Sequence, residues 1–143
     1  MGTTPLEIKI EHGIKPLVIA LNKVSYIQTV SSCEGHPDQD LIDRYQMNKN
    51  PNVVFNLETR YEGEFERLTN RILSRTQNLW QEVLTDVVKR YWNSADNKLQ
   101  HNWRIDFRPF NSKISPHSKM RLYQMVIKEA TEAVEDYASR YKK

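Results

Sequence analysis

The stretch SSCEGHPD, residues 31–38, holds the residue types best suited to chemistry, including the only cysteine and one of the four histidines in the chain. Cys33 and His36 have Cys-x-x-His spacing, and a thiolate with an imidazole can bind a soft metal such as zinc. Zinc sites normally combine this spacing with a second Cys/His pair, which the sequence lacks. We therefore predict no metal site here.

Two other interpretations of the stretch do not need a metal. A nucleophilic Cys33–His36 dyad would require a third group to orient the imidazole, with Glu34 or Asp38 as candidates. Alternatively, Gly35 makes a tight turn and Cys33 is buried as a small apolar side chain. The sequence leaves both interpretations open.

The hydrophobic pattern predicts the elements that position this stretch. Alternating apolar residues favour strands, and apolar residues at spacings of three and four favour helices. Ser115 followed by Pro116 suits the N-cap and first residue of a final helix. The predicted order is a strand at 6–11, a helix over 14–24, a strand at 26–32, a polar loop at about 33–52, a strand at 53–60, one or two helices over 64–92, a strand at 102–110, and a C-terminal helix.

This order predicts a single α+β domain over residues 1–143. A strand-helix-strand-strand-helix-strand order is typical of the ferredoxin-like fold, βαββαβ, whose antiparallel sheet has the strand order 4-1-3-2. The C-terminal helix would be an addition to that fold. We expect its apolar seam to lie in the core or to form a homodimer surface.

The ferredoxin-like topology would bring three parts of the chain to one edge of the sheet. His12 would follow the first strand, Cys33 the second, and His101 would precede the fourth. The turn at this edge could hold a small anionic or nucleotide-like ligand through hydroxyls and backbone amides. The predicted ligand site consists of His12, Ser31, Ser32, Cys33, Glu34, Gly35, His36 and His101.

The segment ALNKVSYIQTVSSCEGHP resembles the N-terminal motif of the wybutosine-synthesis tRNA methyltransferase family, in which a helix ending in Leu-Asn leads into a strand ending Thr-Ser-Ser-Cys-Ser-Gly-Arg. The resemblance implies an α/β protein that binds S-adenosylmethionine without a Rossmann loop and acts on a modified guanosine in tRNA. Glu34 and His36 replace the serine and arginine of that motif. The matching residues are Leu21, Asn22, Thr29, Ser31, Ser32, Cys33 and Gly35.

RNA binding is a separate possibility at the strand NWRIDFRPF. Alternation places Trp103, Ile105 and Phe107 on one face, which we expect to be the core, and leaves Arg104 and Arg108 on the other. Basic side chains on a strand suit phosphate contacts. Residues 63–143 carry fifteen Lys/Arg against ten Asp/Glu, whereas residues 1–62 carry six against eight.

Composition limits the remaining function classes. The 143 residues, with 38% hydrophobic and 27% charged residues, suit an ordinary folded domain. The chain lacks an apolar run long enough for a membrane span, a signal-peptide pattern, and the glycine motifs of dinucleotide and P-loop sites. We expect a cytoplasmic ligand-binding domain. The alternatives are a tRNA methyltransferase relative, a metal- or thiol-dependent enzyme, and a non-catalytic dimerising module.

Overall fold

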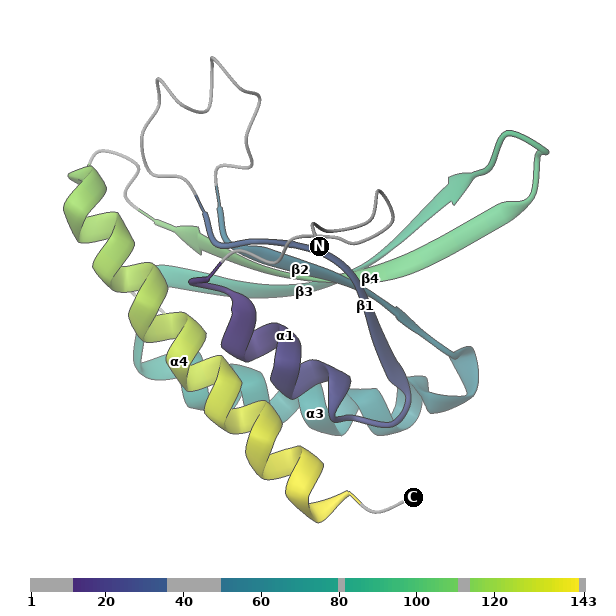
Figure 1. The fold of residues 1–143 in the computed structure, drawn as a ribbon, viewed down its shortest axis with the longest axis horizontal. Coiled ribbons are helices and arrows are strands. Elements are labelled where there is room, and N and C mark those ends of the chain that lie inside the picture. Colours follow the sequence, from purple (N-terminus) through teal and green to yellow (C-terminus); the bar gives the residue numbers. More distant parts are fainter. Residues whose placement is uncertain (1–11, 36–49, 80–81, 111–113, 142–143) are drawn as a thin grey trace, which may run out of the picture.

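The computed structural model describes residues 12–35, 50–79, 82–110 and 114–141. In this part of the chain, helices cover one face of a four-stranded sheet (Figure 1). The α+β class, the antiparallel sheet and the C-terminal helix are therefore confirmed. The elements in chain order are α1 (Lys15–Asn22), β1 (Ile27–Cys33), β2 (Asn52–Leu57), η1 (Thr59–Tyr61), α3 (Glu62–Thr76), η2 (Gln77–Leu79), β3 (Val83–Asn93), β4 (Leu99–Pro109) and α4 (Pro116–Arg140).

The strand order of the sheet is β1-β2-β4-β3, and each neighbouring pair is antiparallel. The ferredoxin-like order 4-1-3-2 is therefore wrong. The strand predicted at 6–11 lies outside the described residues, and the sheet contains a strand, β3, that the sequence pattern did not predict. β4 lies between β2 and β3, and its pairing with β2 ends at Asp106, so Pro109 is paired only with β3.

The helix predicted over 64–92 ends much earlier, since α3 stops at Thr76 and residues 83–93 form β3. The error has a simple geometric cause. Val83, Val87 and Tyr91 are spaced by four, which is close to one helical turn and also equals two full periods of a strand. Val83 and Thr85 are buried, and this alternation together with the β-branched side chains favours the strand.

The core lies between the sheet and the helices. On β2 and β4, the residues that face the helices alternate with residues on the opposite face of the sheet, and Phe55 packs edge-on against Phe65 of α3 at a centroid distance of 5.5 Å. Phe65 in turn contacts Trp103 at 4.9 Å. The largest fully buried side chains are Tyr123, Phe55, Phe65, Phe107, Ile14, Leu17, Leu21, Leu68, Ile72, Ile105, Val18 and Val24.

The apolar seam of α4 belongs to this core. Tyr123, Ile127, Val134 and Tyr137 are at most 5% exposed in the chain by itself, so this seam is not available as a homodimer surface. The Ser115 hydroxyl accepts a hydrogen bond from the Ser118 amide, which confirms the predicted N-cap. Within the described ranges, no helix combines the length and apolar character that a membrane crossing requires.

The β3–β4 hairpin extends beyond the rest of the sheet (Figure 1). β4 pairs with β3 along its whole length, from Leu99 to Pro109, but with β2 only from Trp103 to Asp106. The tip is closed by a turn in which the Ser94 amide donates to the Lys98 carbonyl and Asn97 has a φ of 62°. We call residues 89–101 of this hairpin the arm.

Candidate functional site

The turn after β1 is tightly built around Cys33 and Gly35. Cys33 is 4% exposed, and its sulfur accepts a hydrogen bond from the Gly35 amide at 3.4 Å. Gly35 has a φ of +91°, and a Cβ at this position would lie 2.7 Å from Cδ of Pro51. Only glycine fits both the backbone conformation and this contact with the segment that leads into β2.

Glu34 reaches from this turn to the chain just before α1. The Gly13 amide donates to Glu34 Oε1 at 3.5 Å. A carboxylate near the positive end of a helix is electrostatically favourable, so Glu34 occupies a position where an anionic ligand would otherwise bind. This contact weakens the prediction that the amides at this turn hold a phosphate.

The Leu-Asn and Thr positions of the sequence motif have a structural role here. The Asn22 side chain donates to Thr29 Oγ1 at 2.8 Å and accepts from the Thr29 amide at 3.1 Å. These bonds lie next to the irregularity in β1 between Thr29 and Ser31, where the register with β2 shifts. Asn22 therefore fixes the end of α1 to a bulged strand.

The structure separates His101 from Cys33, whereas His12 directly precedes Gly13, whose amide donates to Glu34 of the turn after β1. His12 lines a pocket between α1 and α4 together with Lys15, Ile19 and Glu135. His101 pairs with Tyr91 on the arm and lines a pocket with Ile27 and Leu57, at the opposite end of β1 from Cys33. His36 lies outside the described residues. The expected position of His101 depended on the strand order 4-1-3-2, whereas β4 lies between β2 and β3 in the described sheet.

The register instead brings together two groups of predicted residues that the sequence kept apart. Directly paired residues of antiparallel strands share a face. Cys33 pairs with Asn52, Asn52 with Asp106, and Asp106 with Asp86. In the adjacent row, Ser31, Val54, Arg104 and Val88 are paired in the same way.

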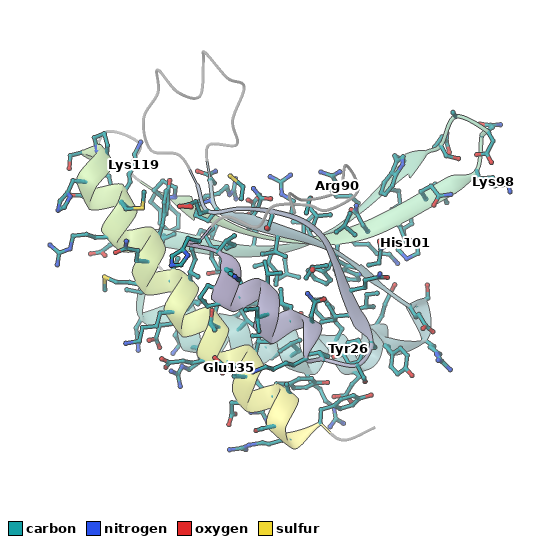
Figure 2. All side chains as sticks on the ribbon, in the orientation of Figure 1. Tyr26, Arg90, Lys98, His101, Lys119 and Glu135 are labelled. Carbon is teal, nitrogen blue, oxygen red and sulfur yellow. The ribbon has the colours of Figure 1, made fainter. Side chains whose placement is uncertain are left out.

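These rows form what we call the polar face, the side of the sheet opposite α1, α3 and α4. Figure 2 shows Arg90 on this side and His101 on the helix side. The predicted separation of Arg104 from the core residues Ile105 and Phe107 is thus confirmed. Ser32 pairs with Val53 and so belongs to the helix side. The polar face includes Gln28, Ser31, Cys33, Asn52, Val54, Asn56, Asp86, Val88, Arg90, Asn102, Arg104, Asp106 and Arg108.

Three polar atoms in a row along β4 are buried without a hydrogen-bond partner. They are Oδ1 of Asn102, Nε of Arg104 and Oδ1 of Asp106, at alternate positions of the strand. Asn102 is only 8% exposed. Because an unpaired buried polar group costs about 1–3 kcal/mol, such atoms normally have a partner in water or in a ligand. Two acceptors flanking one donor therefore mark this strand as the candidate site.

The arginines of the polar face are partly neutralised by carboxylates. Arg104 forms an ion pair with Asp106 at 3.0 Å, and Arg108 with Asp86 at 2.5 Å. Arg104 and Asp106 are both largely buried, with side chains 30% and 15% exposed. Arg104 is therefore a fixed donor in the sheet, and its ion pair with Asp106 makes it less suited to the phosphate contacts expected from the sequence.

The structure adds Asn102, Asp106 and Asn52 to the candidate residues. The alternation that placed Arg104 on the outer face of its strand also placed Asn102 and Asp106 there, so this signal was available in the sequence. Asn52 was not recognisable, because its role depends on pairing between β1, β2 and β4. Within the described ranges, no group of three or more His, Cys, Asp or Glu residues is arranged to hold a metal ion.

Comparison of the chain with known proteins does not assign it to a class. No family model matches it, and no curated protein or solved structure is found to be similar.

Proposed function

We propose that this domain binds a nucleotide-like ligand on the polar face, along β4 between Asn102 and Asp106. The observation that carries the proposal is the set of three buried polar atoms without partners on the polar face of this strand. The site adjoins the turn after β1, since Cys33 and Asp106 both pair with Asn52. The proposal therefore keeps the ligand class expected from the sequence and moves the contacts to the sheet.

The chemistry of the three atoms favours a ligand with both donors and acceptors. Oδ1 of Asn102 and Oδ1 of Asp106 accept hydrogen bonds, and Nε of Arg104 donates one. A simple anion such as phosphate would satisfy Arg104 but would be repelled by the Asp106 carboxylate. A nucleobase edge offers N–H donors and acceptors side by side, which suits this alternation.

S-adenosylmethionine belongs among the ligands to be tested. It contains an adenosine group, and the resemblance of residues 21–36 to a methyltransferase family suggests it independently. Cys33 is a poor candidate for a nucleophile in this proposal, because it is 4% exposed and its sulfur accepts a hydrogen bond from the Gly35 amide. We therefore propose binding and assign no reaction.

Isothermal titration calorimetry with AMP, GMP, UMP, S-adenosylmethionine and inorganic phosphate tests the proposal. We expect at least one nucleoside-containing ligand to bind more tightly than phosphate. Replacing Asn102 by alanine should weaken this binding roughly 5- to 100-fold, because the ligand loses a buried acceptor. The matched control is Asn70→Ala, at an exposed position of α3 on the other side of the sheet.

A second variant separates loss of binding from loss of folding. Asp106→Asn keeps the size of the side chain but replaces the carboxylate with an amide, and its fold can be checked by circular dichroism. We expect weaker nucleotide binding with an unchanged spectrum. Unchanged affinity in both Asn102→Ala and Asp106→Asn, or binding of phosphate alone, would show that the proposed site is wrong.

A further inference from the structure

The arm presents large apolar side chains away from the core. Tyr91 is 57% exposed, Trp92 42% and Leu99 67%. These residues lie where β4 has β3 as its only paired strand within the described sheet, so both faces of the ribbon are accessible there. Exposed aromatic side chains on a projecting hairpin indicate a contact surface.

The arm also concentrates positive charge. Its thirteen residues contain Lys89, Arg90 and Lys98 against Asp96 alone, a net charge of +2, whereas the whole chain of 143 residues carries +3. The Lys89 Nζ atom forms an ion pair with Glu62 Oε2 at 2.6 Å and lies 5.1 Å from the ring centroid of Tyr91. Among the described residues, no ion pair is found for Arg90, so its charge is available to a ligand.

A cleft lies where the arm separates from the rest of the sheet. Its volume is about 410 Å³, and its lining includes the amide side chains of Gln28, Asn56 and Gln100 together with His101. Glu58 also lines it, but its carboxylate is bound by Arg60 at 2.8 Å. Amide side chains offer a donor and an acceptor together, which is the pattern that base edges require.

We infer that the arm binds single-stranded nucleic acid. An unpaired base stacks on Trp92, the phosphates contact Arg90 and Lys98, and the amide side chains of the cleft contact base edges. Aromatic side chains beside a basic surface hold single strands in this way because every base has a stacking face and every linkage a negative charge. A duplex hides its base faces, so we expect it to bind more weakly.

The inference goes beyond the proposed function and uses different side chains. Trp92 and Gln100 form one cross-strand pair, whereas Arg90 pairs with Asn102 of the proposed nucleotide site. Variants of Trp92 and of Asp106 therefore separate the two sites, and Arg90→Glu is interpreted together with them. Failure of one does not imply failure of the other.

Fluorescence anisotropy with labelled 12-nucleotide single-stranded RNA and DNA at low salt tests the arm. We expect binding that weakens as salt increases, because phosphate contacts release counterions. Trp92→Ala should raise Kd roughly 5- to 100-fold, while Trp92→Phe should retain much of the affinity. Arg90→Glu should weaken binding and reduce the salt dependence, and Arg121→Glu, an equal charge change at an exposed position of α4, should have a much smaller effect.

The outcomes separate the possible roles of the arm. Binding that depends on Trp92 and Arg90 but not on Asp106 supports the inference even if no mononucleotide binds. Binding that depends on Asp106 and is unaffected by Trp92→Ala overturns it and leaves the proposed nucleotide site standing. Absence of oligonucleotide binding at low salt also overturns it, and would make the exposed aromatic residues a surface for a protein partner.

Discussion

At the residue scale, two glycines of this chain have opposite roles. Gly35 adopts a φ of +91° and lies against Pro51, so the end of β1 packs against the residue that precedes β2. Gly63 lies in the first turn of α3, and a Cβ there would meet nothing within 4 Å. The first position requires glycine for its backbone conformation, whereas the second does not.

Replacing these glycines by alanine should therefore change stability in opposite directions. We expect Gly35→Ala to lower the free energy of unfolding by at least about 1–2 kcal/mol, because alanine is strained at positive φ and its Cβ would clash with Pro51. Gly63→Ala should be neutral or stabilise the protein by up to about 1 kcal/mol. Chemical denaturation monitored by circular dichroism measures both, and equal effects would contradict this explanation.

At the element scale, α4 has two kinds of polar contact, which are its ion pairs with α3 and the N-cap at Ser115. Arg71 and Arg75 of α3 form ion pairs with Asp136, Glu129 and Glu132 of α4. All of these side chains are at least 34% exposed, so each ion pair contributes little to the free energy of unfolding. The N-cap at Ser115 is a stronger local signal, because it satisfies a backbone donor that the helix leaves unpaired.

Removal of this cap should have a measurable cost. We expect Ser115→Ala to lower the free energy of unfolding by about 1 kcal/mol, and Ser115→Asp to restore most of the loss, because a carboxylate also accepts from the first-turn amides. Thermal denaturation of the three proteins provides the comparison. Equal melting temperatures for Ser115→Ala and the unmodified chain would rule out the cap as a stabilising contact.

At the scale of the whole molecule, buried tyrosines connect α3 and α4 to the residue that precedes β1. The hydroxyls of Tyr26 and Tyr137 lie 2.9 Å apart, and Tyr137 donates to Glu64 at 2.5 Å. Burial raises the pKa of Tyr26 and of Tyr123 to about 12. Burial, followed by the hydrogen bond to Glu64, raises the pKa of Tyr137 well above its usual range.

These pKa shifts predict loss of stability at alkaline pH. In the unfolded chain tyrosine ionises near pH 10, whereas in the folded protein these hydroxyls keep their protons to about pH 12 or above. The folded state thus binds more protons between these values, so the free energy of unfolding falls as pH rises, by about 1.4 kcal/mol per pH unit for each tyrosine. Below pH 9 their protonation contributes no pH dependence.

A single substitution tests this assignment. Tyr123 has a buried hydroxyl without a hydrogen-bond partner, so Tyr123→Phe removes an ionisable group and loses no hydrogen bond. Urea denaturation from pH 8 to pH 11.5 should show a smaller alkaline loss for Tyr123→Phe than for the unmodified chain. Parallel curves for the two proteins would show that Tyr123 does not contribute to the effect.

The sequence by itself determined the features that depend on local pattern and turn chemistry. It predicted the strands near 26–32, 53–60 and 102–110, the first helix, and the N-cap at Ser115. It also placed Arg104 on the face opposite Ile105 and Phe107, because alternation along one strand needs no knowledge of its neighbours.

Only the tertiary structure decided which strands are neighbours. Residues 83–93 satisfied both helical and strand spacing, and pairing with β4 along the whole of β3 made them a strand. That pairing separated His101 from Cys33, and pairing through Asn52 brought Cys33 onto the same face as Asp106. A site built across strands depends on contacts between residues distant in sequence, and hydrophobic periodicity constrains the register of two strands only once their pairing is known.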